Sequence, residues 1–243
     1  MPTTTRCPNM SPKRMARIAG VFYLITIVSA IIAQAPIADR LVRAGNASLT
    51  AANITAHSDL YRFGFTMYMI EMVAQIVMTM LFYELLKPVS RTGSLIAAVI
   101  GVVGCGIKAL SRVFYVAPAL VLSGSRYLDT FSGEQLSSLA LLFYNVNEAG
   151  TVIAVVFFGF NTLLTGWLML RSRYFPRFLG WIAVAGGIAW LAFLWPPLGY
   201  RLNLYIMAIA IPGALATIVY LLVFGVNEDR WAEQLRASPS PAQ

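Results

Sequence analysis

The chain has 243 residues, of which 58% are hydrophobic and only 12% are charged. A soluble domain carries about 25% charged residues, so this composition argues against a water-soluble globular protein. The apolar residues form continuous runs of about 20 residues, the length of helix that crosses a hydrocarbon layer of about 30 Å. A β-barrel would alternate apolar and polar residues instead. We therefore predict an all-α fold, a polytopic transmembrane helical bundle with one domain.

The net charge is +8, but its distribution does not indicate nucleic acid as a partner. The basic residues flank the apolar runs and form no stripe with interleaved aromatic residues, so they are interpreted as topology signals. Cys7 lies in a polar tail, Cys105 in an apolar run and the single histidine, His57, in a loop. This scatter predicts no internal disulfide, no metal site and no cofactor.

Residues 1–16 are polar and predict a disordered cytoplasmic tail before a first span over 17–35. The end of this span, Ala33-Gln34-Ala35, is similar to the cleavage site of a signal peptide. Pro36 directly follows it and argues against cleavage, so a retained helix is predicted. The loop over 36–60 is expected to contain a short interfacial helix from Ser48 to His57, capped by Ser48 or Thr50.

Five further spans follow along the chain. They are predicted over 61–85, over 93–122 with a bend at Pro118, from Ser132 to about Leu170, over 178–195 and over 203–225. Ser132 and Gln135 match a capping box, in which each side chain bonds a free backbone amide of the first turn. The helix that begins there is longer than the membrane is thick, so its first two turns are expected at the interface. The six-helix transmembrane domain thus covers 17–225, and 226–243 form a cytoplasmic C-terminal tail whose last residues, 237–243, are frayed.

The six spans divide the basic residues unequally between the two sides. One side has Arg6, Lys13, Arg14, Arg17, Lys87, Arg91, Arg171, Arg173, Arg177, Arg230 and Arg236. The other has Arg40, Arg43, Arg62, Arg126 and Arg201. Because Lys and Arg accumulate on the cytoplasmic side, both termini are predicted to be cytoplasmic.

Four ionisable residues lie inside the predicted spans: Glu71, Lys108, Arg112 and Glu148. A charged side chain at the centre of a bilayer costs about 2.5–3.5 kcal/mol on insertion scales. These groups must therefore face other helices or a hydrated cavity.

Polar residues accompany them at helical spacing. Gln75 follows Glu71 by four residues, Lys108 and Arg112 are also four apart, and Asn145 precedes Glu148 by three. Each pair lies on one face of its helix, and the pairs lie at similar depth. We expect one buried polar site made of Glu71, Gln75, Lys108, Arg112, Asn145 and Glu148. Within it, Arg112 is expected to bind a carboxylate through two parallel hydrogen bonds.

Three functions remain open for this site. A purely structural network would hold the helices together, as satisfied buried charges need no further purpose, and the protein would have a structural or accessory role. A small carrier would use the same residues to bind a polar ligand or move a proton. A lipid-modifying enzyme is the weakest hypothesis, because the sequence has no motif for a nucleophile, a metal or a phosphate-binding loop. We therefore expect no enzymatic activity.

Several short stretches resemble the bacterial "domain of unknown function 4386" family, and their order carries the resemblance. They are ARIAGVFYL at 16–24, TAANI at 50–54, YRFG at 61–64, LFYELLKPV at 81–89, FFG at 157–159 and RSRYFPRFLG at 171–180. The resemblance spans roughly 15–225 and implies a bacterial integral protein of the plasma membrane with several helices. It implies no catalytic residue, because the family has no established activity.

Overall fold

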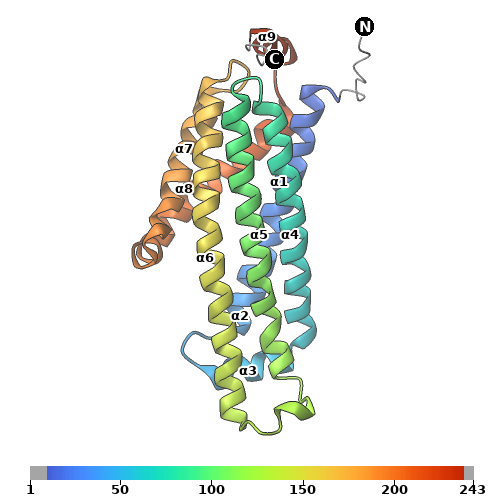
Figure 1. Cartoon of the computed structure of the whole chain (residues 1–243), viewed down its shortest axis with the longest axis vertical. Helices are drawn as coiled ribbons and strands as arrows, with labels where there is room; N and C mark the ends of the chain where they lie inside the picture. The colour runs from blue at the N-terminus through green and yellow to red at the C-terminus, as the bar shows by residue number, and fades with distance from the viewer. Residues whose placement is uncertain (1–9, 238–243) are drawn as a thin grey trace.

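A computed structural model describes residues 10–237, which form helices joined by short turns (Figure 1). The helices are α1 (Pro12–Ala33), the π-helical turn η1 (Gln34–Ala38), α2 (Asp39–Leu41), α3 (Ala47–Ala56), α4 (Ser58–Leu86), α5 (Arg91–Val121), η2 (Arg126–Leu128), α6 (Gly133–Arg171), α7 (Arg177–Leu191), η3 (Ala192–Leu194), α8 (Pro196–Val223) and α9 (Glu228–Ala237). Six helical segments are long and apolar enough to cross a membrane. The predicted all-α bundle with six spans is confirmed.

The two ends of the predicted transmembrane domain differ from the structure. Helix α1 begins at Pro12, where the Ser11 side chain accepts a hydrogen bond from the Arg14 backbone amide, so the last residues of the predicted tail are helical. At its other end α1 continues without a break through η1 into α2, past the expected end at 35. Part of the predicted C-terminal tail folds as α9. Residues 1–9 and 238–243, where the rest of the tails was predicted, lie outside the described residues.

The predicted helix caps are partly confirmed. Ser132 and Gln135 form the capping box at the start of α6. The predicted cap of α3 is wrong: Asn46 occupies that position, and its side chain accepts a hydrogen bond of 2.9 Å from the Leu49 backbone amide. The Thr50 hydroxyl donates instead to the Asn46 carbonyl one turn earlier, at 2.8 Å. The helix starts earlier than expected because Asn46 has the extended backbone that a cap requires.

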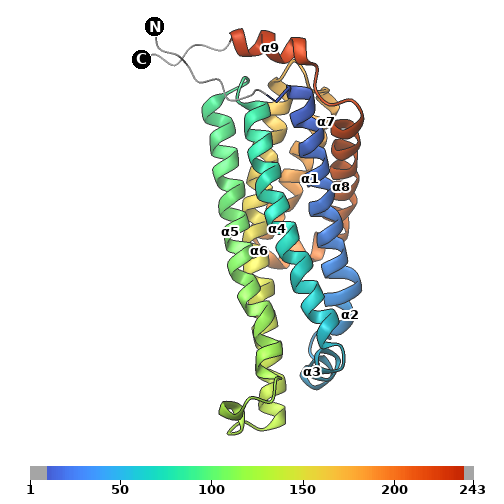
Figure 2. The ribbon, with the colours of Figure 1, turned by 90° about the vertical axis from the view of Figure 1, so that its right-hand side faces the viewer.

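The long helices α4, α5 and α6 lie side by side along the whole bundle, whereas α7 and α8 cover only part of it (Figures 1 and 2). A Cβ atom added to Gly159, in the second half of α6, would lie 3.1 Å from Trp190 and 3.0 Å from Leu191, the last residues of α7. The first half of α6 therefore extends past the turn between α7 and α8. At that level the bundle consists of the end of α1, α3, α4, α5 and α6.

Two hydrophobic cores lie at opposite ends of the bundle. One includes Leu85, Leu86, Leu168, Leu179 and Leu221, from α4, α6, α7 and α8. The other is rich in tyrosine and includes Tyr61, Tyr68, Tyr115 and Tyr144. The rings of Tyr61 and Tyr115 stack with centroids 4.4 Å apart, and each hydroxyl donates to the backbone carbonyl of the other residue, at 2.6 and 3.3 Å. These bonds fix α4 against α5 near the end that also contains α3.

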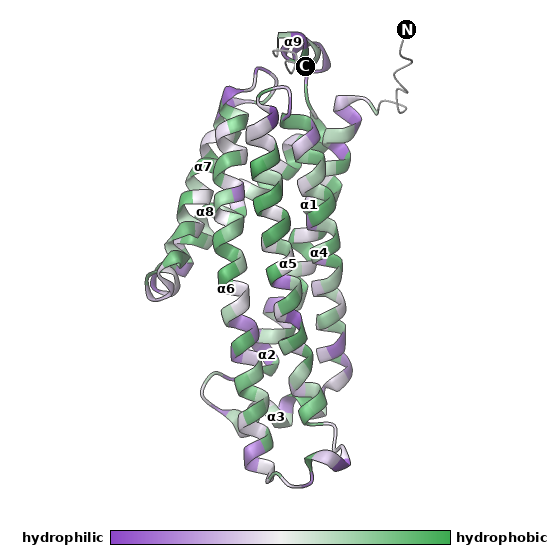
Figure 3. Cartoon of the chain, viewed as in Figure 1, coloured by the Kyte–Doolittle hydropathy of each residue, from purple (hydrophilic) through white to green (hydrophobic). Residues whose placement is uncertain are grey.

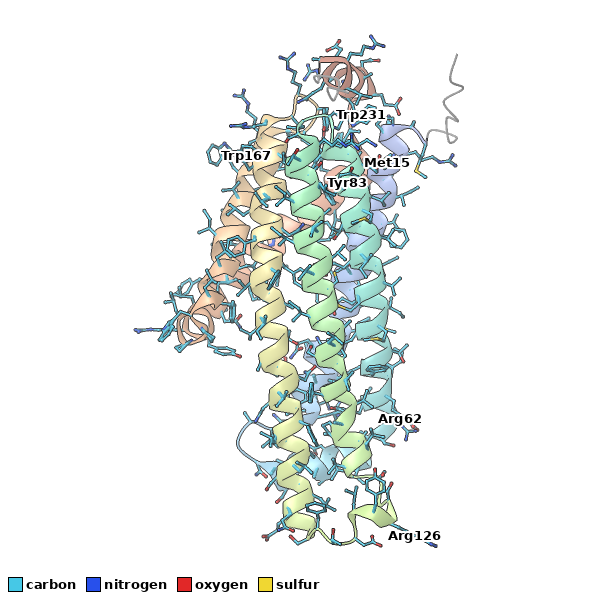
Figure 4. The ribbon with its side chains drawn as sticks, viewed as in Figure 1. Met15, Arg62, Tyr83, Arg126, Trp167 and Trp231 are labelled. Atoms are coloured by element: carbon cyan, nitrogen blue, oxygen red, sulfur yellow. The ribbon has the colours of Figure 1, made fainter. Side chains whose placement is uncertain are left out.

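Helix α9 lies across the end of the bundle where α1 begins (Figure 2). The Trp231 indole donates a hydrogen bond of 3.1 Å to the Leu85 carbonyl at the end of α4. The Tyr174 hydroxyl, from the turn before α7, donates to the same carbonyl at 2.6 Å. Burial raises the pKa of Tyr174, so its hydroxyl keeps the proton that it donates. Figure 4 shows Trp231 at this end and Arg62 and Arg126 at the opposite end.

Candidate functional site

Hydrophilic residues interrupt the apolar helices within the half of the bundle that contains α2 and α3 (Figure 3). The first contact there joins α4 to α5. Lys108 forms an ion pair and a hydrogen bond with one carboxylate oxygen of Glu71. The Lys108 side chain is 11% exposed and that of Glu71 only 3%, so this pair is almost fully removed from solvent. A buried, paired charge of this kind strongly opposes separation of the two helices.

Arg112, one turn further along α5, is the largest fully buried side chain of the described residues. Its Nη1 donates a hydrogen bond of 2.9 Å to the amide oxygen of Asn147 on α6. Its guanidinium carbon lies 3.6 Å from the centroid of the Tyr68 ring on α4, within the range of a cation–π contact. The expected bidentate pair with a carboxylate is therefore wrong. The nearest carboxylate on α4 is taken by Lys108, and Arg112 binds a neutral amide and an aromatic face instead.

Further hydrogen bonds extend this contact in two directions. Asn147 donates to the carboxylate of the neighbouring Glu148 at 3.1 Å. Glu148 is half-buried and lies within electrostatic range of Arg112 and Lys108. Two acidic and two basic side chains therefore lie within one region.

The other direction starts at Tyr68, whose ring contacts Arg112. The Tyr68 hydroxyl donates to the Gln34 side chain at 2.7 Å, and Gln34 donates to Asp39 at 2.7 Å. Asp39 is exposed. A continuous series of polar side chains thus connects buried Arg112 with the surface of the protein at the end of α1.

Two polar atoms of the network are buried without a hydrogen-bond partner among the described residues: Oε2 of Glu71 and Nε of Arg112. Such atoms are rare, and each one raises the free energy of the folded state relative to a fully bonded network. One is an acceptor and the other a donor. Each of these two deeply buried side chains therefore keeps one bonding position unused.

The structure brings together four of the six predicted residues: Glu71, Lys108, Arg112 and Glu148. Gln75 is half-buried one turn from Glu71, and no hydrogen bond joins its side chain to the network within residues 10–237. Asn145 is exposed. Its place is taken by Asn147, which is completely buried. Positions two apart on a helix differ by about 200° in direction, so these two asparagines lie on opposite faces.

Sequence reasoning missed Asn147, Tyr68 and Gln34. Tyr68 lies four residues after Gly64, where an added Cβ would lie 2.6 Å from the Tyr115 hydroxyl. Because Gly64 has no Cβ atom, α4 can lie close to α5 at this point. This close approach cannot be predicted from the sequence. Asn147 is adjacent to Glu148 in the sequence. Pairing residues that lie three or four apart on a helix selects Asn145 instead of Asn147.

The part of the chain that the structure describes holds no group of three or more His, Cys, Asp or Glu side chains arranged to bind a metal ion. The polar groups present are two carboxylates, two cations, amides and phenols. This chemistry suits proton exchange, ion pairing or hydrogen bonding.

The six apolar spans and the buried charged network define a multi-pass helical membrane protein. Residues 18–225 match the family described as "Domain of unknown function (DUF4386)". The chain belongs to this family, as the resemblance of its short stretches implied. No curated protein and no solved structure matches the chain.

Proposed function

We propose that the protein is a non-enzymatic structural or accessory component of the membrane, in which the charged network holds α4, α5 and α6 in register. The ion pair between Lys108 and Glu71 carries this proposal. It joins two helices at nearly complete burial, where loss of one partner leaves an isolated charge in a medium of low dielectric constant.

The position of the network supports the same reading. The bond between Arg112 and Asn147 joins α5 to α6, so the two contacts together connect three helices. Two cavities in the described part of the bundle are lined by residues outside the network.

A double-mutant cycle tests this structural role. Glu71→Gln and Lys108→Met each leave one buried charge unpaired, so each is expected to lower the free energy of unfolding by about 3–5 kcal/mol. The double variant has no unpaired charge and should recover most of that loss. Thermal unfolding of the purified protein in detergent measures the three variants. Single variants as stable as the parent would contradict the proposal.

A second candidate function is a small carrier linked to protons or polar solutes. The polar side chains that run from exposed Asp39 through Gln34 and Tyr68 to Arg112 favour it. Through Asn147 this series connects the surface with the carboxylate of Glu148, which can accept a proton. Proton flux through the reconstituted protein separates the two candidates.

A further inference from the structure

A second polar region lies in the other half of the bundle and shares no residue with the charged network. It is a cavity of about 60 Å³ lined by residues of all six spans. Tyr83 is one of them, and Figure 4 shows it near Trp231, at the end covered by α9. Convergence of every span on one small space is the arrangement in which helical membrane proteins place ligand sites.

In four lining residues the side chain already donates a hydrogen bond to a backbone carbonyl. The hydroxyls of Thr79, Ser94 and Thr217 donate to a carbonyl three or four residues earlier in their own helices, at 2.7, 3.1 and 2.9 Å. The Asn161 amide nitrogen donates to the Ala97 carbonyl on α5 at 2.7 Å. Each of these groups keeps an oxygen with free lone pairs. They therefore present acceptors to a molecule in the cavity.

Four other lining hydroxyls have no hydrogen bond to the described residues: those of Tyr23, Tyr83, Thr162 and Thr165. Each can donate or accept. The cavity has no charged side chain in its lining. Because a buried charge without a counter-charge is costly, this lining favours an uncharged ligand that carries several hydrogen-bond donors.

The available space limits the size of such a ligand. A second cavity, also of about 60 Å³, shares Tyr23, Thr162, Ala183 and Thr217 with the first and therefore adjoins it. One water molecule needs about 10–15 Å³ on this measure, so each cavity holds about four to six atoms of that size. Urea and glycerol fall within this range.

We propose that this cavity binds a small uncharged solute of the amide or polyol class. The solute donates hydrogen bonds to the Thr79, Thr217 and Asn161 oxygens and accepts from the unbonded hydroxyls, among them Thr162. This site is independent of the structural role assigned to the charged network. It gives the protein a ligand whether or not the network also moves protons.

Saturation-transfer NMR on the full chain in detergent tests the proposal with three probes: urea, glycerol and methylammonium. We expect saturation transfer from the protein to urea or to glycerol. Transfer to urea indicates that an amide binds, and transfer to glycerol indicates that a polyol binds. The double variant Thr162→Val/Thr217→Val removes two lining hydroxyls at almost constant side-chain shape and should lose the signal. If this variant does not fold, Thr162→Val alone carries the test.

Thr66→Val is the matched control, because the Thr66 hydroxyl also bonds a carbonyl one turn earlier but is exposed outside the cavity. It should bind the probes like the parent protein. Equal signals from the parent, the cavity variants and Thr66→Val would overturn the proposal, as would no signal from urea and glycerol. Transfer to methylammonium alone would overturn the assignment to an uncharged ligand.

Discussion

Arg112 is the residue whose surroundings differ most from those of an ordinary membrane arginine. It is 1% exposed and depends on a neutral amide, Asn147, and an aromatic ring, Tyr68, for its direct contacts. A guanidinium keeps its charge under all ordinary conditions, so it cannot reduce the cost of burial by losing a proton. Its contacts therefore determine whether this part of the bundle is stable.

Replacing Asn147 tests whether the stability of the bundle depends on the contact between its amide and Arg112. Asn147→Leu keeps a similar volume but removes the acceptor for Arg112 and the donor to Glu148, leaving the buried cation without a hydrogen-bond partner from the protein. We expect the free energy of unfolding to fall by about 3 kcal/mol or more, as for other broken contacts of a buried charge. Chemical or thermal unfolding in detergent measures this loss.

Asn145→Leu is the control for this variant, because the same change falls on an exposed position of the same helix. Its effect should stay within about 0.5 kcal/mol. Equal effects of the two substitutions would mean that the Asn147 amide is not what holds Arg112.

At the scale of elements, the contact between α6 and α7 depends on glycine. A Cβ added at Gly187 would lie 2.6 Å from the Leu163 backbone nitrogen, and one at Gly166 would lie 2.7 Å from that of Val184. Backbone atoms cannot rotate away as a side chain can. The two helices are therefore held at a separation that only glycine permits, as is common in membrane bundles.

Gly187→Ala should force α7 away from α6 and destabilise the protein by about 1–3 kcal/mol, the usual cost of overpacking. Gly186→Ala is its neighbour and matched control, since an added Cβ there meets nothing within 4 Å. Melting temperatures in detergent compare the two variants. A Gly187→Ala protein that melts together with Gly186→Ala would show that α6 and α7 can separate at little cost.

The six spans could be predicted because their signal is local. Each needs about 20 apolar residues, and in a bilayer a helix satisfies its own backbone hydrogen bonds. The same locality explains the confirmed capping box at Ser132 and Gln135. Helix α9 was missed because its charged sequence resembles a tail. It docks through distant partners, with Trp231 bonded to Leu85 on α4.

The charged site could be predicted only as a set of residues. Helical periodicity places Lys108 and Arg112 on one face, but the choice between Glu71 and Glu148 as a partner depends on the axial offset of α4 against α5 and α6. That offset is fixed by contacts such as the stacked pair of Tyr61 and Tyr115. These contacts lie far apart in the sequence.

For the whole molecule, the start of α1 and helix α9 lie at one end of the bundle, and Arg62 and Arg126 lie at the other (Figures 2 and 4). This arrangement agrees with the division of basic residues used to predict cytoplasmic termini, which remains a prediction. The charged network lies in the half near Arg62 and the neutral cavity in the half near α9. The two polar regions are thus separate in position and in chemistry.

A charged network with a purely structural role does not conduct protons. Proton flux into liposomes that contain the purified protein and an internal pH-sensitive dye, driven by a potassium diffusion potential, tests it most directly. We predict equal flux for the parent protein, the Glu71→Gln/Lys108→Met variant and liposomes without protein. Flux of the parent protein above the liposome leak, abolished in the folded double variant, would contradict the claim and identify the network as a proton pathway.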